Sequence, residues 1–302
     1  MVTRHLNHPI RILLLGNTGQ LGWELERTLI PLGELLACDY PGVDLANIES
    51  IRRVFHHCKP HLTINAAAYT AVDRAETEPD LAYTINAIAP AIIAEEAHKT
   101  GSAIIHFSTD YVFDGLKAIP YLETDSANPL SVYGSTKLAG ERGVQQIGGA
   151  HLILRTSWVY SMRRDSFVNK VLSWARSQPS LKLVTDQVSG PTWARMLAEV
   201  TSHLVLLGGD DIVDWLSEHG GLYHLAGSGY CSRFEWGQEV LRLDPHKEEQ
   251  VVHELLSALT AEFPTPARRP LFSALNCDKF SQTFRTNLPE WKLALKLAME
   301  SV

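Results

Sequence analysis

The 302-residue sequence lacks any long apolar run and any cluster of lysine and arginine. Its first apolar run, at residues 10–15, is too short for a secretory signal and contains Arg11. No run approaches the roughly 20 apolar residues of a membrane-spanning helix. The formal net charge is -7, whereas proteins that bind nucleic acid need a basic surface to meet the phosphates. We therefore expect no membrane span and no nucleic-acid partner.

The sequence is also poor in cysteine. Its four cysteines are Cys38, Cys58, Cys231 and Cys277, and no two of them form a C-x-x-C pair. This scatter indicates reduced thiols, as in a cytoplasmic protein. The 45% hydrophobic and 20% charged content is typical of a soluble globular chain. Its length is sufficient for one large α/β domain or for two unequal domains.

Strand and helix patterns alternate through the first half of the chain. Apolar runs predict strands at 10–15, 34–39, 61–68, 102–108 and 151–157, and amphipathic patterns predict helices at 20–33, 48–58, 80–101 and 131–147. Such alternation implies an α/β fold with a Rossmann-type, doubly wound parallel sheet. After about residue 155, prolines and turns become frequent. We expect a dinucleotide-binding domain at 1–155 and a smaller C-terminal α/β substrate domain at 156–302, with some elements returning to the main sheet.

A glycine-rich segment, "GNTGQLG" at 16–22, follows the first predicted strand and opens the first helix. Gly16 would permit a tight turn, Gly19 would let backbone N–H groups approach a pyrophosphate, and Gly22 would allow close packing of helix on strand. Asp39 ends the second strand, where a carboxylate can accept hydrogen bonds from an adenine ribose. This position favours NAD(H) without excluding NADP(H). A glycine turn that binds nothing is disfavoured by the strand before it and the helix after it.

Polar residues follow the fourth predicted strand. Ser108, Thr109, Asp110 and Tyr111 would lie at the carboxyl end of a central strand, where open parallel sheets bind ligands. A hydroxyl there can hydrogen-bond a substrate oxygen, although Thr109 and Asp110 could instead satisfy backbone donors in a turn. The position in the fold favours a functional role. The alanines of "NAAAYTAVD", residues 65–73, would either make room for a flat ligand or pack tightly, and both alternatives stay open.

A tyrosine and a lysine lie four residues apart in "VYGSTK", so Tyr133 and Lys137 share a helix face. The spacing alone is weak evidence, but the cofactor and Thr109 motifs give it meaning. Tyr133 would donate a proton to a carbonyl oxygen as hydride reaches the carbon. We expect the Lys137 ammonium, together with the positive end of the nicotinamide, to lower the pKa of the phenol from about 10 toward working pH. Lys137 could also hold the nicotinamide ribose, and Thr109 would fix the carbonyl.

Seven segments together resemble the extended short-chain dehydrogenase/reductases and, within them, the dTDP-4-dehydrorhamnose reductase family. They are "GNTGQLGWELER", "NAAAYTAVDRAE", "STDYVFDG", "YGSTKLAGE", "RTSWVY", "DQVSGPT" and "PTPARRP", in the family's order and over almost the whole chain. The glycine loop and the Tyr-x-x-x-Lys pair are shared by the whole superfamily. The segments "STDYVFDG", "RTSWVY" and "PTPARRP" are specific.

The resemblance implies reduction of the C4 ketone of dTDP-4-dehydro-L-rhamnose by NADPH or NADH. Tyr133 would be the proton donor, with Lys137 its partner and Thr109 tuning the site. The residues implied to line the dinucleotide are Gly19, Gln20, Leu21, Asp39, Asp44, Leu45, Ala68, Tyr69 and Thr70. Those implied to contact the dTDP-sugar are Thr109, Asp110 and Trp158. Arg268 and Arg269 could reach the substrate diphosphate or cap a surface loop, and both roles stay open.

One departure from the family concerns metal. In some members, acids at a dimer contact are thought to bind a divalent cation. Glu24 is present here, but Arg195 stands where a second acid is expected. Binding of Mg²⁺ and a homodimer of that kind therefore stay open.

Two alternative functions were weighed. Nucleotide-sugar dehydratases carry Asp-Glu where this chain has Asp110 followed by Tyr111, so the base they need is missing. A non-catalytic subunit, like the regulatory subunit of methionine adenosyltransferase, could lose Tyr133 and Lys137 without penalty, and this chain retains both. An enzyme is favoured, although another nucleotide-sugar 4-keto reductase or epimerase remains an alternative.

Overall fold

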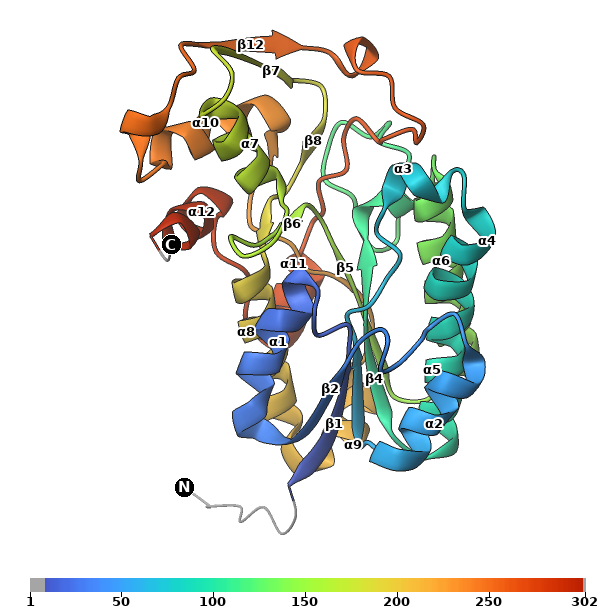
Figure 1. Ribbon diagram of the computed structural model, residues 1–302. Coiled ribbons are helices and arrows are strands. Elements are labelled where there is room, and N and C mark those ends of the chain that lie inside the picture. Colours follow the sequence, from blue (N-terminus) through green and yellow to red (C-terminus); the bar gives the residue numbers. More distant parts are fainter. Residues whose placement is uncertain (1–8, 301–302) are drawn as a thin grey trace.

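The computed structural model describes residues 9–300. Its centre is a six-stranded sheet in the order β10-β5-β4-β3-β1-β2 (Figure 1). The strands are β1 (Ile10–Leu15), β2 (Gly33–Cys38), β3 (Leu62–Asn65), β4 (Ala103–Thr109), β5 (His151–Thr156) and β10 (Gly221–His224). All adjacent pairs in this sheet are parallel. The prediction of a Rossmann-type parallel sheet is confirmed.

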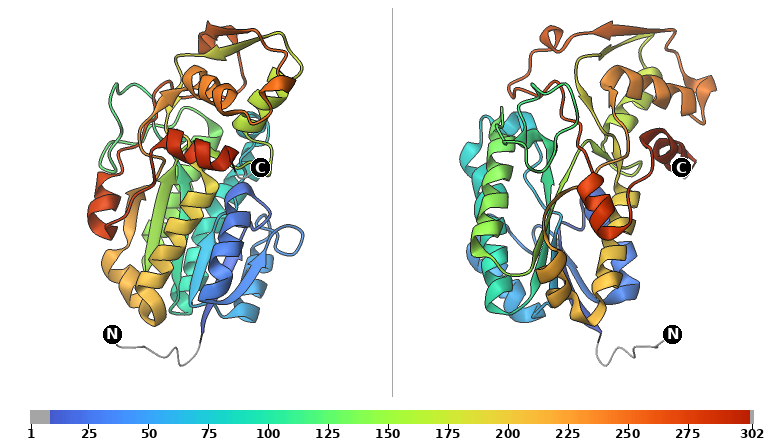
Figure 2. Two further views of the ribbon diagram at one scale, coloured as in Figure 1. Left: turned by 90° about the vertical axis from the view of Figure 1, so that its left-hand side faces the viewer. Right: turned by 180° about the vertical axis from the view of Figure 1, so that it is seen from behind.

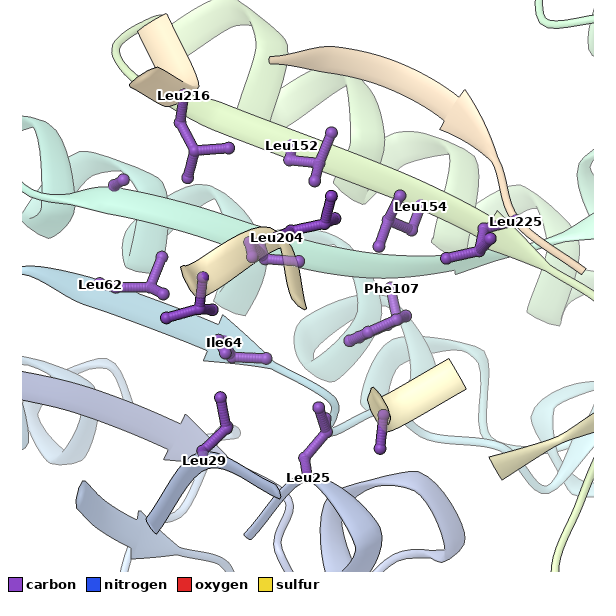
Figure 3. Packing of buried hydrophobic residues seen from close by; sticks show 14 of the residues in the cluster. Leu25, Leu29, Leu62, Ile64, Phe107, Leu152, Leu154, Leu204, Leu216 and Leu225 are labelled. Atoms are coloured by element: carbon purple, nitrogen blue, oxygen red, sulfur yellow. The ribbon is translucent and has the colours of Figure 1, made fainter. Parts of the chain in front are cut away.

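Successive strand residues point to opposite faces of the sheet, and both faces are covered by helices. In β4, Ile105 and Phe107 join one buried cluster, whereas Ile104 joins the other. The first face packs against α1 (Gln20–Leu29), α8 (Ala194–Gly208), α9 (Ile212–His219) and α11 (Asp278–Phe284), and the second against α2 (Ile48–Cys58), α5 (Ala89–Lys99) and α6 (Val132–Ile147). Figure 3 shows leucines of α1, α8 and α9 meeting those of the strands. This double burial explains why the strands are almost continuously apolar.

Two predicted helices are interrupted. The helix predicted at 20–33 ends at Leu29, and Pro31 lies in a short 3-10 turn, η1 (Ile30–Leu32), before β2. The helix predicted at 80–101 consists of α4 (Pro79–Tyr83), a π-helical turn η2 (Thr84–Ile88) and α5. The wider π turn carries Asn86, whose side chain accepts from the backbone N–H of Tyr69 and donates to its carbonyl.

Elements from the second half of the chain contribute to the sheet and also extend beyond it. β10 pairs with β5 at the sheet edge, and α8 packs beside α1. The remaining elements lie beyond the carboxyl ends of the strands (Figures 1 and 2). They are η3 (Asp110–Val112), α3 (Val72–Ala75), β6 (Val159–Tyr160), α7 (Phe167–Ala175), β7 (Ser180–Val184), β8 (Val188–Ser189), β9 (Thr192–Trp193), β11 (Cys231–Ser232), α10 (Arg233–Leu243), η5 (Lys247–Glu249), β12 (Glu254–Ala258), η6 (Thr260–Glu262) and α12 (Trp291–Met299). The 3-10 turn η4 (Gly209–Asp211) instead joins α8 to α9 at the other end of the sheet. In the described part of the chain, no helix is long and apolar enough to cross a membrane.

Candidate active site

The glycine loop joins β1 to α1 in a turn that side chains would obstruct. Gly16 has φ 88°, and a Cβ there would lie 2.7 Å from the backbone of Ala67. A Cβ on Gly22 would overlap the carbonyl group of Gly16. Gly19 is the N-cap of α1, whose first turn contains no acidic residue and no side-chain cap. The N–H groups and dipole at this end of α1 can therefore bind an anion.

Asp39, the residue after β2, lies beside this loop. Its carboxylate accepts from the hydroxyl of Thr18 at 2.5 Å and from the backbone N–H of Tyr40 at 2.8 Å. These bonds hold one carboxylate oxygen against the loop and the other against its own strand end. The geometry suits an acid that accepts hydrogen bonds from ribose hydroxyls.

A cavity of about 700 Å³ runs from the glycine loop across the carboxyl ends of the strands. The predicted site residues that line it are Gly16, Gly19, Gln20, Leu21, Asp39, Asp44, Leu45, Ala68, Thr70, Thr109, Asp110, Tyr133, Lys137 and Trp158. Two predicted residues do not line it. Gly22 packs beneath the loop, and the Tyr69 phenol donates to Glu78. The size and place of this cavity are those of a cofactor and substrate site.

Residues that the sequence analysis did not single out also line the cavity. They are Thr18, Tyr40, Val43, Ile85, Phe107, Thr156, Ser157, Val159, Arg164 and Asp165. Ser108 and the alanines Ala66 and Ala67, which the sequence did mark, line it as well. Most of the residues not singled out lie next to a predicted motif and could have been found by extending it. Arg164 and Asp165 belong to an exposed loop between β6 and α7, and no motif in the sequence marked that loop.

Tyr133 and Lys137 enter the cavity from the first turns of α6. The hydroxyl of Ser131 caps this helix by accepting from the backbone N–H of Gly134 at 3.2 Å. The ring of Tyr133 meets the edge of Tyr111, with centroids 5.8 Å apart. The Lys137 ammonium is buried and donates to the carbonyl of Phe107 at 2.7 Å. Both side chains are thus held against the end of β4.

The direction of the pKa shift at Tyr133 is opposite to the one expected from the sequence. Burial raises the pKa of Tyr133 well above its usual value, and the nearby Thr109 hydroxyl only partly opposes the rise. Burial lowers the pKa of Lys137 to about 8. Burial disfavours phenolate and ammonium alike, and spacing in the sequence does not reveal burial.

Asp110 lines the cavity, is almost completely buried, and accepts hydrogen bonds from three hydroxyl groups. It accepts from the hydroxyls of Ser273 at 2.5 Å, Ser189 at 3.1 Å and Thr109 at 3.1 Å. Burial nevertheless raises its pKa to about 6. Ser189 and Ser273 come from the second half of the chain, so Asp110 ties the end of β4 to those segments.

Trp158 lies on the opposite wall in a left-handed backbone conformation, with φ 40°. Its indole stacks on Trp236 at a centroid distance of 5.5 Å, and the Arg233 guanidinium lies 3.6 Å above its ring centre. The backbone strain and the stacking together fix the ring at the cavity wall. Trp236 itself is buried in the core.

The two arginines of "PTPARRP" differ in environment. Arg269 donates to Asp73 at 2.7 Å and to the carbonyl of Ala267 at 3.2 Å, whereas Arg268 is exposed. Arg269 therefore fastens its loop to α3. Neither arginine lines the main cavity.

The carboxylate of Glu24 faces the guanidinium of Arg195. Glu24 is buried on α1, and its carboxylate lies 3.6 Å from the Arg195 guanidinium. Arg195 also pairs with Glu199 at 2.6 Å. A guanidinium in this position repels a divalent cation, so the residues around Glu24 do not fit a Mg²⁺ site.

Comparisons with known proteins agree with this geometry. A family model described as RmlD substrate binding domain matches residues 10–302. The chain is 42% identical over 295 residues to a dTDP-4-dehydrorhamnose reductase of Escherichia coli (strain K12), covering 95% of this chain and 96% of that protein. A solved dTDP-4-dehydrorhamnose reductase of Clostridium acetobutylicum ATCC 824 superposes with a TM-score of 0.87 at 36% identity, covering 96% of this chain and 98% of that one.

A second solved structure carries a cofactor. It is the dTDP-4-dehydrorhamnose reductase of Bacillus anthracis str. Ames in complex with NADP, with a TM-score of 0.88, 31% identity and coverage of 97% of this chain and 99% of that one. Fold and site define an NAD(P)H-dependent oxidoreductase of the extended short-chain type. Within that class, the chain belongs to the dTDP-4-dehydrorhamnose reductase family.

Proposed function

We propose that this protein reduces the C4 ketone of dTDP-4-dehydro-L-rhamnose to give dTDP-L-rhamnose. The observation that carries the proposal is that one cavity holds the glycine loop, Asp39, Thr109, Tyr133 and Lys137 together. Similarity to the curated reductase of E. coli supports the substrate. The retained pair Tyr133 and Lys137 favours an enzyme over a non-catalytic binding subunit.

The dinucleotide would lie along the glycine loop. Backbone N–H groups of Gly19, Gln20 and Leu21 at the start of α1 would bind its pyrophosphate, and Asp39 its adenine ribose. Bound NADPH or NADH would supply the hydride. The complex of the B. anthracis relative with NADP supports NADPH, while Asp39 favours NADH, so we propose that both are accepted.

Residues at the other end of the cavity would act on the ketone. Thr109 would hold the carbonyl oxygen, and the O–H of Tyr133 would donate its proton to that oxygen as the carbon receives hydride. The raised pKa of Tyr133 keeps the phenol protonated, as a proton donor requires. The ammonium of Lys137 would then favour the phenolate that forms. Asp110, which follows Thr109, and Trp158 would contact the sugar nucleotide.

We further propose that residues 1–155 bind the dinucleotide and 156–302 the substrate, with β10 and α8 serving the main sheet. A cytoplasmic location is supported by the four free thiols, Cys38, Cys58, Cys231 and Cys277. A homodimer is proposed without a metal bridge, because Arg195 occupies the place beside Glu24.

The test follows NADPH absorbance with purified protein and dTDP-4-dehydro-L-rhamnose. We expect oxidation that requires both components, with dTDP-L-rhamnose as the product. Cofactor binding without oxidation would contradict the reductase and favour the binding subunit. Running dTDP-4-keto sugars that differ at one hydroxyl in parallel identifies the preferred substrate.

A further inference from the structure

A buried chain of side chains leads from the end of β3 to Lys137. The Nδ2 of Asn65 lies 3.1 Å from the Nδ1 of His106, and the Nε2 of His106 lies 3.5 Å from the Nζ of Lys137. Asn65 and His106 are both fully buried, and Lys137 is 2% exposed. Neither Asn65 nor His106 lines the main cavity. They therefore act on the site through Lys137 or not at all.

The backbone fixes the orientation of the Asn65 amide. The N–H of Ala67 donates to the Oδ1 of Asn65 at 3.2 Å, so the oxygen must face Ala67. Turning the amide over would set its NH₂ group against that N–H. The NH₂ group must therefore face His106, and the Nδ1 of His106 accepts a hydrogen bond from it.

The accepting Nδ1 decides where the imidazole carries its proton. Burial, together with the charge of Lys137, holds the pKa of His106 well below its usual range, so the ring is neutral. A neutral ring that accepts at Nδ1 carries its hydrogen on Nε2. That N–H points toward the Nζ of Lys137. If Lys137 is an ammonium, its N–H groups face the Nε2–H of His106, which is also a donor. A neutral amine at Lys137 could instead accept a hydrogen bond from that N–H.

The other charged and titratable groups around Lys137 do not reverse this effect. Tyr133 and Glu141 lie on α6 with Lys137, His106 and Asp110 come from β4 and η3, and Arg155 comes from β5. From β3, only the neutral Asn65 faces this group. Glu141 would favour the ammonium, but it is bound by Arg155 at 2.9 and 2.7 Å and by Ser108 at 2.5 Å.

We propose that Asn65 and His106 are positioning residues that weaken the hold of Lys137 on its proton, with the N–H of Ala67 fixing the tautomer. Ala67 lines the main cavity, so the same segment that borders the cofactor also sets the state of Lys137. His106 is not a proton relay, because its Nδ1 faces an amide that cannot supply a proton. The inference rests on the proposed reductase function for its kinetic test, but not for its spectroscopic one.

Asn65→Asp is the decisive variant. A carboxylate can accept from both the N–H of Ala67 and the Nδ1–H of His106, so it keeps the first bond and reverses the tautomer. The Nε2 of His106 then accepts from Lys137 and favours the ammonium. We expect the alkaline fall of kcat to move up by about one pH unit, with the KM for NADPH little changed. A fall that stays in place or moves to lower pH would overturn the proposal.

The added negative charge needs its own control. The double variant Asn65→Asp/His106→Phe keeps the carboxylate but removes the ring that transmits the tautomer. We expect most of the shift to disappear in it. An equal shift in the single and double variants would mean that charge alone acts, and that His106 does not transmit the effect.

Nitrogen NMR of ¹⁵N-histidine-labelled protein tests the tautomer without any turnover. His106→Phe identifies the His106 signals. We expect the hydrogen on Nε2 in the wild type and on Nδ1 in Asn65→Asp. A wild-type ring with its hydrogen on Nδ1 would contradict the proposal, even if the reductase assay succeeds. Failure of that assay, in turn, leaves this measurement intact.

Discussion

The proposed role of Tyr133 can be tested by removing a single oxygen atom from its side chain. Tyr133→Phe removes only the phenolic O–H, so the ketone would lose its proposed proton donor while the other proposed contacts to the dinucleotide stay. We expect turnover to fall by about 100- to 10,000-fold, the usual contribution of a general acid. NADPH affinity, measured by fluorescence titration, should stay nearly constant. Tyr223→Phe, whose hydroxyl only donates to the carbonyl of His219, is the matched control. Equal activity in Tyr133→Phe would remove Tyr133 as the acid.

The raised pKa of Asp110 predicts that the stability of the folded protein depends on pH. Its pKa in the folded protein is about 6, above the ordinary value of about 3.9, because the carboxyl is buried. Between these values the folded state binds the proton more tightly than the unfolded chain. Stability is therefore lost as pH rises through this window, and the loss is complete above it.

Asp110→Asn stays neutral at every pH and escapes this loss. We expect it to be more stable than the wild type by on the order of 2 kcal/mol at about pH 7.5, with the difference shrinking toward about pH 4. Thermal denaturation at several pH values measures it, with the exposed Asp210→Asn as control. A difference independent of pH would mean that the Asp110 carboxyl does not carry the effect. Loss of activity in the same variant would reflect its proposed contact with the substrate.

At the level of single residues, spacing and order in the sequence predicted positions better than environments. Gly16, Asp39 and Tyr133 were found because each occupies a fixed place relative to a strand or a helix. The expected pKa of Tyr133 did not include burial, because burial depends on the whole fold. Arg164 was missed because it reaches the cavity from a loop that only tertiary structure brings there.

The position of α6 depends on an unusually close approach at Gly134. A Cβ there would overlap the carbonyl of Tyr111 and lie 3.0 Å from Pro129. Gly134→Ala should therefore displace the first turn of α6, and Tyr133 with it. We expect a loss of about 1–3 kcal/mol in unfolding free energy and a lower kcat. Denaturant unfolding and steady-state assays measure the two effects.

Ser135→Ala is the matched control for Gly134→Ala. Ser135 is the next residue of the same helix turn, and its side chain is exposed. The change to alanine should raise stability by a few tenths of a kcal/mol through helix propensity alone. If Gly134→Ala were as stable and as active as Ser135→Ala, the close approach would not position the site.

Among the elements, the strands and helices of the first half followed from apolar periodicity. The π turn at 84–88 did not, because a single widened turn is too short to be recognised in the apolar pattern. Asn86 in this turn bonds the backbone of Tyr69, 17 residues away, and such a contact depends on the tertiary structure. β10 is only four residues long, and its pairing with β5 depends on a partner more than sixty residues away. No local pattern specifies such a pairing.

At the scale of the molecule, the cavity joins two parts of the chain that should respond to different ligands. One wall comes from the glycine loop and Asp39, and the other includes Trp158. Ligand that binds only the folded state stabilises it by about 2.7 kcal/mol at 100 times its Kd. For a chain of this size we expect NADPH to raise Tm by roughly 4–5 °C, and NADP⁺ with dTDP-L-rhamnose to raise it further than NADP⁺ alone.

Trp158→Ala separates the two ligands. Its indole lines the cavity, is held by Arg233 and Trp236, and is proposed to contact the sugar nucleotide. We therefore expect this variant to keep the NADPH-induced rise in Tm and to lose the additional rise from dTDP-L-rhamnose, measured by differential scanning fluorimetry. Loss of both rises would mean that Trp158 supports the whole cavity rather than one end of it. If the variant kept both rises, the sugar nucleotide would not contact Trp158. That result would also contradict the proposal that the second half of the chain binds the substrate.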